Sequence, residues 1–227
     1  MVIINSPRQG PRRRAIGDDM KERRRREILD AALRLLERRS YASITMSAVA
    51  TAAGVAKGTT YLYFPTREAL FLALLDEHYE SWFDALDTRL RVPALTPQAW
   101  AAWAARELAA RPLFLRLVAV LHVVLEANVP VPDVLAFKGR LAARSATSGA
   151  LIEHTLGLAP GDGRRLLLWL QGMVPGLAQM AAPPAPLREA LCADPALAGF
   201  LVDFSTELEA LLAALVRGMQ NHTETSP

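Results

Sequence analysis

Apolar residues recur every three or four positions along most of the chain, which is the spacing of one buried face of an α-helix. We find no run of strict apolar and polar alternation, the pattern of a half-buried strand. Ala and Leu dominate between prolines, and 52% hydrophobic residues in 227 can bury a substantial core. The pattern predicts an all-α fold of about nine helices, one starting after Asp18 or Asp19 and the others covering about 46–53, 56–64, 67–90, 97–110, 112–127, 132–156, 162–180 and 195–219.

Several helix ends carry capping signals. Thr96 precedes Pro97, and Asp194 precedes Pro195, an order that places an N-cap before the residue best suited to the first helical position. Gly157 follows a long helical pattern and is expected to close it, because glycine readily adopts the left-handed conformation of a helix end.

The segment TMSAVATAAGVAKGTTYLYFPTREALF (45–71) predicts two short helices around a tight turn, with a third helix following. Thr45 is a suitable N-cap, and Gly54 can take the positive φ that ends the first helix. The second helix then begins at once. Its early and outward positions carry polar and aromatic residues, as a recognition helix in a DNA major groove requires: Lys57, Gly58, Thr59, Tyr61 and Tyr63.

At these residues the chain resembles the TetR family of bacterial transcriptional regulators. That family has a signature close to A-G-V-(S/A)-K-G-T-x-Y-x-Y-F-x-(S/T)-(K/R)-E-x-L, which stands here as AGVAKGTTYLYFPTREAL. The likeness extends over roughly residues 22–83. It implies an N-terminal three-helix DNA-binding domain, a larger helical domain for an effector and for dimerisation, and a double-stranded DNA operator as partner.

The resemblance also implies roles for individual residues. Lys57 and Thr59 would lie beside bases and phosphates, and Gly58 would let the backbone approach DNA closely. Tyr61 and Tyr63 would donate hydrogen bonds to phosphate oxygens, although core aromatics are the alternative for such a pattern. The full predicted DNA-binding set is Thr45, Lys57, Gly58, Thr59, Tyr61, Leu62, Tyr63 and Arg67, with Arg67 holding a phosphate at the start of the next helix, behind the expected cap Thr66.

Three positions depart from the family pattern. Leu62 stands where a polar residue is frequent, so it offers apolar contact to a thymine methyl group and no hydrogen bond. Pro65 replaces a residue that is commonly lysine, which removes one phosphate contact. Ser40 stands where glycine usually ends the first helix. The operator sequence is therefore not readable from this helix.

Charge is distributed unevenly. Residues 1–67 contain 14 Lys and Arg against 6 Asp and Glu, whereas residues 68–227 contain 12 against 17. A net +8 beside the predicted DNA motif is the electrostatic footprint of a polyanion-binding domain. For the leader that contains Arg8 and Arg12–Arg14, two interpretations are equally favoured: an arm in the minor groove, or a solvated tail that adds non-specific affinity.

These observations predict four parts of the chain. They are a disordered basic arm (1–20), a helix-turn-helix DNA-binding domain (21–66), a helical effector-binding and dimerisation domain (67–220) and a disordered tail (221–227).

We expect a homodimer through the last two long helices, because one short recognition helix reads few bases and because these helices are unusually apolar. Gly172 and Gly176 would allow close helix approach. The apolar stripes consist of Leu166, Leu167, Leu170, Met173, Val174 and Leu177 on one helix and Leu201, Phe204, Leu208, Leu211, Leu212 and Leu215 on the other.

The helices between the DNA motif and this interface are where family members hold a small effector. Apolar walls with few polar groups are typical of ligand sites, although most aromatic residues at helical spacing belong to an ordinary core. The candidate lining residues are Trp100, Trp103, Phe114, Leu117, Leu121, His122, Leu125, Glu126, Phe137, Trp169, Gln171 and Met173.

Catalytic and metal-binding motifs are poorly represented. His122 and Glu126 lie four apart on one helical face, where they could orient a ligand, bind a metal or, the interpretation we favour, bond to each other. No glycine-rich phosphate loop, nucleophile elbow or paired acidic motif indicates an enzyme, and we predict no cofactor and no metal. A helical scaffold protein would leave the basic N-terminal region unexplained.

Cys192 is the single cysteine, which excludes an intrachain disulfide and suits a reducing cytoplasm. An inert thiol is favoured there over a redox sensor. We expect neither a signal peptide nor a membrane span, since polar residues and Pro175 interrupt the longest apolar stretch, 166–182. The expected location is the cytoplasm, at the nucleoid.

The sequence thus predicts a homodimeric repressor that binds a near-palindromic operator and is released by a small effector. The continuous helix over 67–90 would carry the effector's influence to the recognition helix as a population shift. The effector, the operator and the regulated genes cannot be inferred from the sequence.

Overall fold

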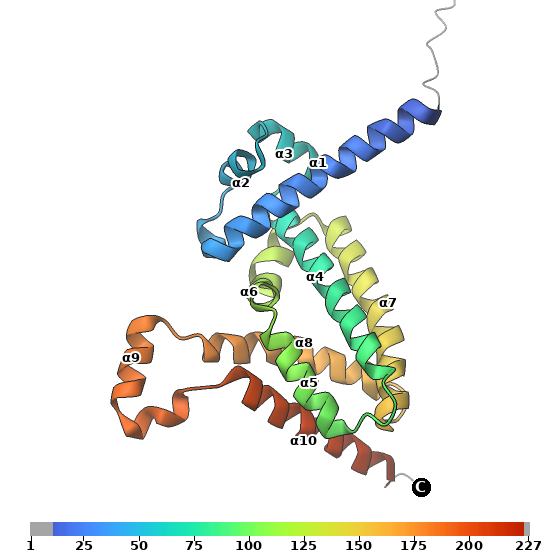
Figure 1. Cartoon of the computed structure of the whole chain (residues 1–227), viewed down its shortest axis with the longest axis vertical. Helices are drawn as coiled ribbons and strands as arrows, with labels where there is room; N and C mark the ends of the chain where they lie inside the picture. The colour runs from blue at the N-terminus through green and yellow to red at the C-terminus, as the bar shows by residue number, and fades with distance from the viewer. Residues whose placement is uncertain (1–10, 225–227) are drawn as a thin grey trace, which may run out of the picture. The chain divides into compact units, whose positions relative to one another are not determined.

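The computed structural model describes residues 11–224, and this part of the chain is helical and contains no strand. The chain divides into two compact units at the junction between Leu70 and Phe71. The first unit contains α1 (Pro11–Arg38), the short 3-10 helix Tyr41–Ser43, α2 (Met46–Ala53), α3 (Lys57–Tyr63) and the start of α4 (Arg67–Leu90) (Figure 1). The all-α prediction is confirmed.

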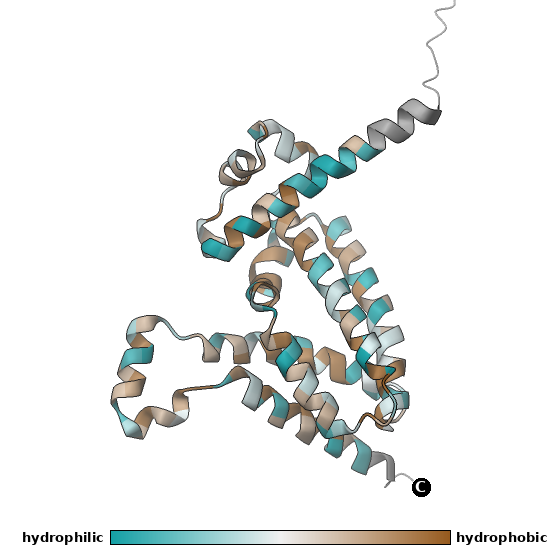
Figure 2. Cartoon of the chain, in the orientation of Figure 1, coloured by the Kyte–Doolittle hydropathy of each residue, from teal (hydrophilic) through white to brown (hydrophobic). Residues whose placement is uncertain are grey.

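The first unit has a small apolar core. Helix α1 packs on α2, and α2 packs on α3. In the coloured part of α1, Figure 2 shows mostly hydrophilic residues ahead of the apolar ones. The buried positions begin at Ile28. The core side chains are Ile28, Leu29, Ala31, Ala32, Leu36, Ile44, Met46, Val49, Ala50, Phe64 and Leu70.

The first helix begins earlier than predicted. The sequence indicated a disordered arm to residue 20 and a helix after Asp18 or Asp19, but α1 starts at Pro11 and includes Arg12–Arg14. Proline suits the first turn of a helix, and arginine is a good helix former, so the single Gly17 is outweighed. The first four residues of the predicted tail (221–227) belong to α10, which ends at Glu224. The arm residue Arg8 and the tail residues 225–227 lie outside the described part of the chain.

The second unit contains the rest of α4 and the following helices. They are α5 (Pro97–Ala109), α6 (Pro112–Val120), the π-helical turn Leu121–Leu125, the 3-10 turn Glu126–Asn128, α7 (Val131–Leu156), α8 (Asp162–Ala181), α9 (Ala185–Ala193), the 3-10 helix Pro195–Phe200 and α10 (Phe204–Glu224). The Thr96 hydroxyl accepts from the Ala99 amide at 3.1 Å, and Gly157 closes α7 at φ +65°.

Helix α8 lies near the centre of this unit, in contact with α6, α7 and α10, while α10 also packs along α5. Helices α7 and α8 approach closely at Gly149 and Gly163, where a methyl group on either glycine would overlap the other helix. The core therefore depends on glycine at this crossing.

Two predicted helices differ in the structure. The helix predicted for 112–127 changes to a π turn after Val120, in a valine-rich stretch whose β-branched side chains lower helix propensity. The helix predicted for 195–219 starts only at Phe204, because Asp194 caps the short 3-10 helix through the Ala196 amide at 2.9 Å. The separate α9 was not predicted.

Part of the predicted dimer stripe lies inside the subunit. Leu166, Leu167, Leu170 and Val174 of α8, with Leu208 and Leu212 of α10, are buried by the subunit's own helices. They are unavailable to a partner, so this part of the prediction is wrong. An apolar stripe at helical spacing does not reveal which neighbour covers it.

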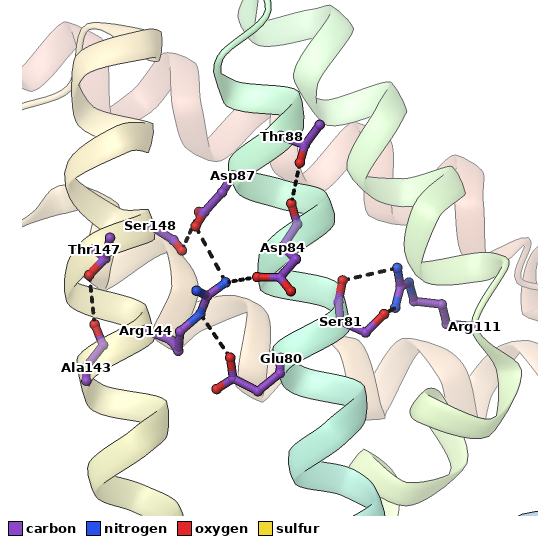
Figure 3. A network of polar contacts seen from close by, with 10 residues as sticks. All are labelled: Glu80, Ser81, Asp84, Asp87, Thr88, Arg111, Ala143, Arg144, Thr147 and Ser148. Carbon is purple, nitrogen blue, oxygen red and sulfur yellow. Dashed lines mark hydrogen bonds and ion pairs between the residues drawn. The ribbon is translucent and has the colours of Figure 1, made fainter.

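A polar network joins α4 to α7 (Figure 3). Arg144 on α7 pairs with the carboxylates of Glu80, Asp84 and Asp87 on α4 at 3.4, 2.8 and 3.5 Å. Ser148, one turn after Arg144, donates to the buried Asp87 carboxylate at 2.6 Å. These contacts hold the two helices in register.

No single helix of the described chain is both long and apolar enough to cross a membrane; the bent pair Pro97–Ala109 and Pro112–Asn128 meets the length and composition criteria only when its two parts are taken together.

Candidate nucleic-acid interface and ligand cavity

The turn between α2 and α3 has the predicted local geometry. Thr45 Oγ1 accepts from the Ala48 amide at 3.1 Å at the start of α2. Gly54 ends α2 at φ +67°, and the Val55 amide donates to the Ala50 carbonyl at 3.0 Å. These bonds satisfy backbone groups that a helix end leaves unpaired, so the next helix can begin three residues later.

Helix α3 presents an exposed face. Leu62 is 82% exposed and Tyr61 43% exposed, and Lys57 and Gly58 also lie on the surface. Thr59 and Tyr63 are half-buried. The helix is anchored by Thr60, which is fully buried and donates from Oγ1 to the Lys57 carbonyl at 2.7 Å. Leu62 and Tyr61 thus leave apolar side-chain surface exposed on this short helix.

The surface around Gly58 is open. A methyl group added at this residue would meet no atom within 4 Å. The protein's own packing therefore does not require glycine at this position. Close approach of another molecule to the backbone would require it.

Arg67 begins α4, as predicted, and its side chain makes several contacts within its own domain. Its Nε and Nη2 atoms donate to Glu68 Oε1 at 3.0 and 2.8 Å, and Nη1 donates to the Ile44 carbonyl at 3.1 Å. Its guanidinium also lies over the Tyr41 ring, 4.6 Å from the ring centre. These contacts hold the guanidinium inside the domain, and the phosphate contact of Arg67 stays a prediction. The partner carbonyl is 23 residues away, beyond any local signal.

Tyr41 and Glu68 complete this cluster. The Tyr41 hydroxyl donates to Glu68 Oε1 at 3.1 Å. Burial, followed by the nearby Glu68 charge, raises the pKa of Tyr41 to about 12. Burial alone would raise the pKa of Glu68, but the hydrogen bonds from Arg67 and Tyr41 outweigh it, and the pKa is lowered overall. The charged carboxylate therefore links the start of α4 to the segment before α2.

The second unit contains a cavity of about 640 Å³ between α4, α6, α7 and α8, within the usual size range of small-molecule sites. Its walls are largely apolar and aromatic. The lining residues are Tyr79, Trp82, Phe83, Leu108, Phe114, Val118, Lys138, Leu141, Ala142, Ser145, Gly161, Arg164, Arg165, Leu167, Leu168, Leu170, Gln171 and Val174.

The predicted lining residues agree only in part with this cavity. Phe114 and Gln171 lie on its wall. The other candidates are elsewhere: Trp100, Leu117, Leu121, Leu125 and Phe137 are buried in the helical core, Trp103 and Met173 are half-buried away from the cavity, and Trp169 is exposed. Helical periodicity identifies a buried face without showing which part of it borders a cavity.

His122 and Glu126 bond to each other, as favoured from the sequence, with Nδ1 3.2 Å from Oε2. Lys138 Nζ lies 2.6 Å from Glu126 Oε1. Burial would raise the pKa of Glu126, but the bonds from Lys138 and His122 lower it overall. Within the described residues, no group of three His, Cys, Asp or Glu side chains is arranged to hold a metal ion.

Several lining residues were missed from the sequence. Tyr79, Trp82 and Phe83 of α4 and Leu141, Ala142 and Ser145 of α7 line the cavity but are not among the residues predicted to do so. A signal was present on α7, since Lys138, Leu141, Ala142 and Ser145 follow the spacing of one helical face.

Residues 28–74 match the family of bacterial regulatory proteins named after tetR, and residues 76–223 match the tetracyclin repressor-like C-terminal domain. The chain belongs to the TetR family. The two matches divide the TetR protein close to the junction between its two compact units.

Curated transcriptional regulators are similar to part of the chain. The transcriptional repressor KstR of Mycolicibacterium smegmatis is 37% identical over 82 residues, which make up 36% of this chain and 40% of KstR. The transcriptional regulator EthR of Mycobacterium tuberculosis is 40% identical over 90 residues, or 40% of each chain. The chain thus matches about 40% of the length of these relatives.

Solved structures share the fold over more of the chain. A possible TetR family regulator from Streptomyces coelicolor has a TM-score of 0.60 at 23% identity, with 87% of this chain and 99% of that chain covered. FadR from Bacillus subtilis, solved in complex with stearoyl-CoA, has a TM-score of 0.51 at 17% identity, with 83% and 97% covered.

Proposed function

We propose that the protein is a homodimeric transcriptional repressor that binds a near-palindromic DNA operator through α3 and is released by a small effector. The observation that carries this proposal is the exposed face of α3, with Lys57, Gly58, Tyr61 and Leu62 on the surface behind a capped turn. KstR and EthR, which are similar to 36% and 40% of this chain, are themselves described as a transcriptional repressor and a transcriptional regulator. As a regulator of this kind, the protein would act in the cytoplasm, at the nucleoid.

On the operator, the side chains of α3 would divide between backbone and base contacts. Lys57, Thr59 and the two tyrosines Tyr61 and Tyr63 offer a cation and hydroxyl groups for phosphates, which fix the position of the protein on the duplex. Leu62 offers apolar contact to a thymine methyl group. Thr45 would add a contact at the start of α2, where its hydroxyl is exposed.

Net charge supports DNA as the partner. Residues 1–67 hold 14 basic against 6 acidic side chains. Neutralising phosphates releases bound counterions, so affinity should fall as salt rises. An enzyme or a scaffold of the same fold would not require this concentration of positive charge.

Dimerisation through α8 and α10 is supported by the faces that the subunit leaves exposed. Trp169, Gly172, Gly176 and Met180 share one side of α8 at helical spacing and are on the surface. On α10, Leu211 and Gly218 are exposed beside the buried face. Small residues beside large apolar ones allow two helices to pack closely, and a two-fold dimer would place two α3 helices on neighbouring half-sites.

The cavity of about 640 Å³ is the proposed effector site. Tyr79, Trp82 and Phe83 on its wall belong to α4, the same helix that carries Arg67 and Glu68 in the DNA-binding unit. An effector that binds one arrangement of α4 better than another would shift the population away from the operator-binding form. Unchanged separation of the two α3 helices on effector binding, measured between spin labels, would contradict this coupling.

The first experiment is a mobility shift with footprinting on DNA flanking the protein's own gene, at two salt concentrations and against excess random DNA. A protected near-palindrome that survives the competitor supports the proposal. Binding that is indifferent to sequence and disappears with salt would overturn it, because the basic surface alone would explain the result.

A further inference from the structure

The charged side chains that line the cavity are all positively charged. The lining includes the cations Lys138, Arg164 and Arg165 and no aspartate or glutamate. Two of these cations already have carboxylate partners, since Lys138 pairs with Glu126 at 2.6 Å and Arg165 with Asp162 at 3.0 Å. Arg164 is exposed and has no carboxylate within ion-pair distance among the described residues. Its charge is therefore available to a ligand.

Two buried donors among the lining residues lack an acceptor with good hydrogen-bond geometry. Trp82 is 5% exposed, and its Nε1 has no hydrogen-bond partner in the described part of the chain. The Nε2 atom of Gln171 also lacks an acceptor with good hydrogen-bond geometry; its polar neighbour is the Tyr79 hydroxyl, whose pKa is raised by burial and partly lowered by Gln171. Buried polar groups are nearly always paired, because an unpaired one costs about 1 to 3 kcal/mol. Small rotations of these side chains toward an oxygen atom in the cavity would recover that cost.

The free cation and the unpaired amide lie at different points along the cavity. Arg164 and Gln171 are seven residues apart on α8, which corresponds to about 10 Å along a helix. Between them the wall is formed by Leu167, Leu168 and Leu170, together with residues of α7. A ligand that contacts both groups must be elongated and apolar in its middle.

We propose that the cavity binds an elongated organic carboxylate, with its anionic head at Arg164, an apolar chain along α8 and a neutral oxygen acceptor near Trp82 and Gln171. This inference rests on the proposed effector site and names its chemical class. The anion is held by a charge-assisted hydrogen bond, which is stronger than a neutral one. The distal oxygen adds selectivity, because it satisfies donors that an all-carbon tail would leave unpaired.

The test is calorimetric titration of the full-length protein with four probes that share one carbon chain: omega-hydroxydecanoate, decanoate, decanol and decanoyl-CoA. The expected order of affinity is omega-hydroxydecanoate, then decanoate, then decanol. Equal affinity for decanol and decanoate would overturn the proposal that the ligand binds through an anionic head group. Equal affinity for omega-hydroxydecanoate and decanoate would overturn the proposal that the cavity binds a distal oxygen acceptor. Binding of decanoyl-CoA alone would show that a coenzyme A ester is the true class.

Substitutions assign the contacts. Arg164→Gln should weaken decanoate binding roughly ten- to hundredfold, as expected for a lost hydrogen bond to a charged group, while Arg164→Lys should retain much of the affinity. Gln171→Leu should reduce the advantage of omega-hydroxydecanoate over decanoate. Arg106→Gln, an exposed arginine of α5 away from the cavity, is the charge-matched control. Equal loss in Arg106→Gln would overturn the assignment of the head group to Arg164.

Thermal unfolding followed by circular dichroism shows whether each variant is folded, and Arg164→Lys serves as the folded comparison if Arg164→Gln unfolds. Operator binding is measured separately. If the protein binds its operator but none of the carboxylates, the ligand class is wrong and the DNA-binding proposal stands. If it binds the carboxylates but no operator, the DNA-binding proposal is wrong and the ligand class stands.

Discussion

Arg67 donates two hydrogen bonds to the carboxylate of its chain neighbour Glu68, from Nε and Nη2 to Oε1 at 3.0 and 2.8 Å. A third nitrogen reaches the Ile44 carbonyl, just before the cap of α2. The first residues of α4 are thereby tied to the start of the helix-turn-helix. Arg67 thus helps to fix the start of α4 within the DNA-binding unit.

The Glu68 cluster should make the DNA-binding unit sensitive to acid. The pKa of Glu68 is lowered in the folded state, so the cluster stabilises the fold above the ordinary glutamate pKa and loses this effect as pH falls through the folded-state pKa. Glu68→Gln should therefore lower the melting temperature at pH 7, and the difference from wild type should shrink under acid. A difference independent of pH, in melting curves followed by circular dichroism, would contradict this role of the charge.

Gly54 and Gly58 form a matched pair for separating folding from DNA binding. Gly54→Ala should destabilise the protein by about 1 to 2 kcal/mol, because alanine is strained at positive φ. Gly58→Ala meets open space and should leave stability unchanged or raise it by about 0.5 to 1 kcal/mol, yet weaken operator binding if the backbone approaches DNA. Chemical denaturation and mobility shifts measure the two effects. Full operator affinity in Gly58→Ala would show that the DNA backbone does not approach this residue.

Lys57→Ala and Tyr61→Phe should weaken operator binding while the fold stays intact, since both side chains are on the surface. The lysine change should also lower the slope of log affinity against log salt by about one unit if it removes a phosphate contact. Binding is measured by fluorescence anisotropy over a salt series, with Arg106→Ala in the other unit as the charge-matched control. Wild-type affinity in both variants would refute the assignment of α3 as the recognition helix.

Ser148→Ala should destabilise the second unit by about 1 to 3 kcal/mol. The change removes the hydrogen bond that the serine donates to Asp87, a carboxylate only 5% exposed, and leaves part of that charge unsatisfied. The neighbouring Thr147→Ala is the control, because Thr147 is exposed and should change stability by less than about 0.5 kcal/mol. The free energy of unfolding of each variant is measured in urea. Equal values for the two variants would mean that Arg144 alone satisfies the Asp87 carboxylate.

Gly176→Arg should convert the proposed dimer to a monomer. Gly176 lies on the exposed face of α8, where a side chain meets nothing within the subunit, so only a partner subunit would collide with it. Gly139→Arg is the matched control, since Gly139 is equally open on α7 and outside the proposed interface. Light scattering after size exclusion gives the mass of each variant. If the Gly176→Arg variant has the mass of a dimer, the interface does not include this face of α8.

The sequence alone was sufficient where the determining contacts are local. The Thr45 and Thr96 caps each bond to an amide three residues later, and Gly54 needs only its own backbone freedom. For the same reason α4 begins and ends at the predicted residues, Arg67 and Leu90. Such contacts lie within one helical turn, so a short stretch of sequence contains all of their information.

Tertiary structure decided the features that depend on distant residues. Trp100 and Trp82 are both apolar positions on amphipathic helices, yet only Trp82 borders the cavity, because the neighbours of each helix differ. Leu208 is covered by its own subunit, and Arg67 is held by a carbonyl 23 residues away. Helical periodicity determines which side of a helix is buried, whereas the partner on that side is chosen by packing of the whole chain.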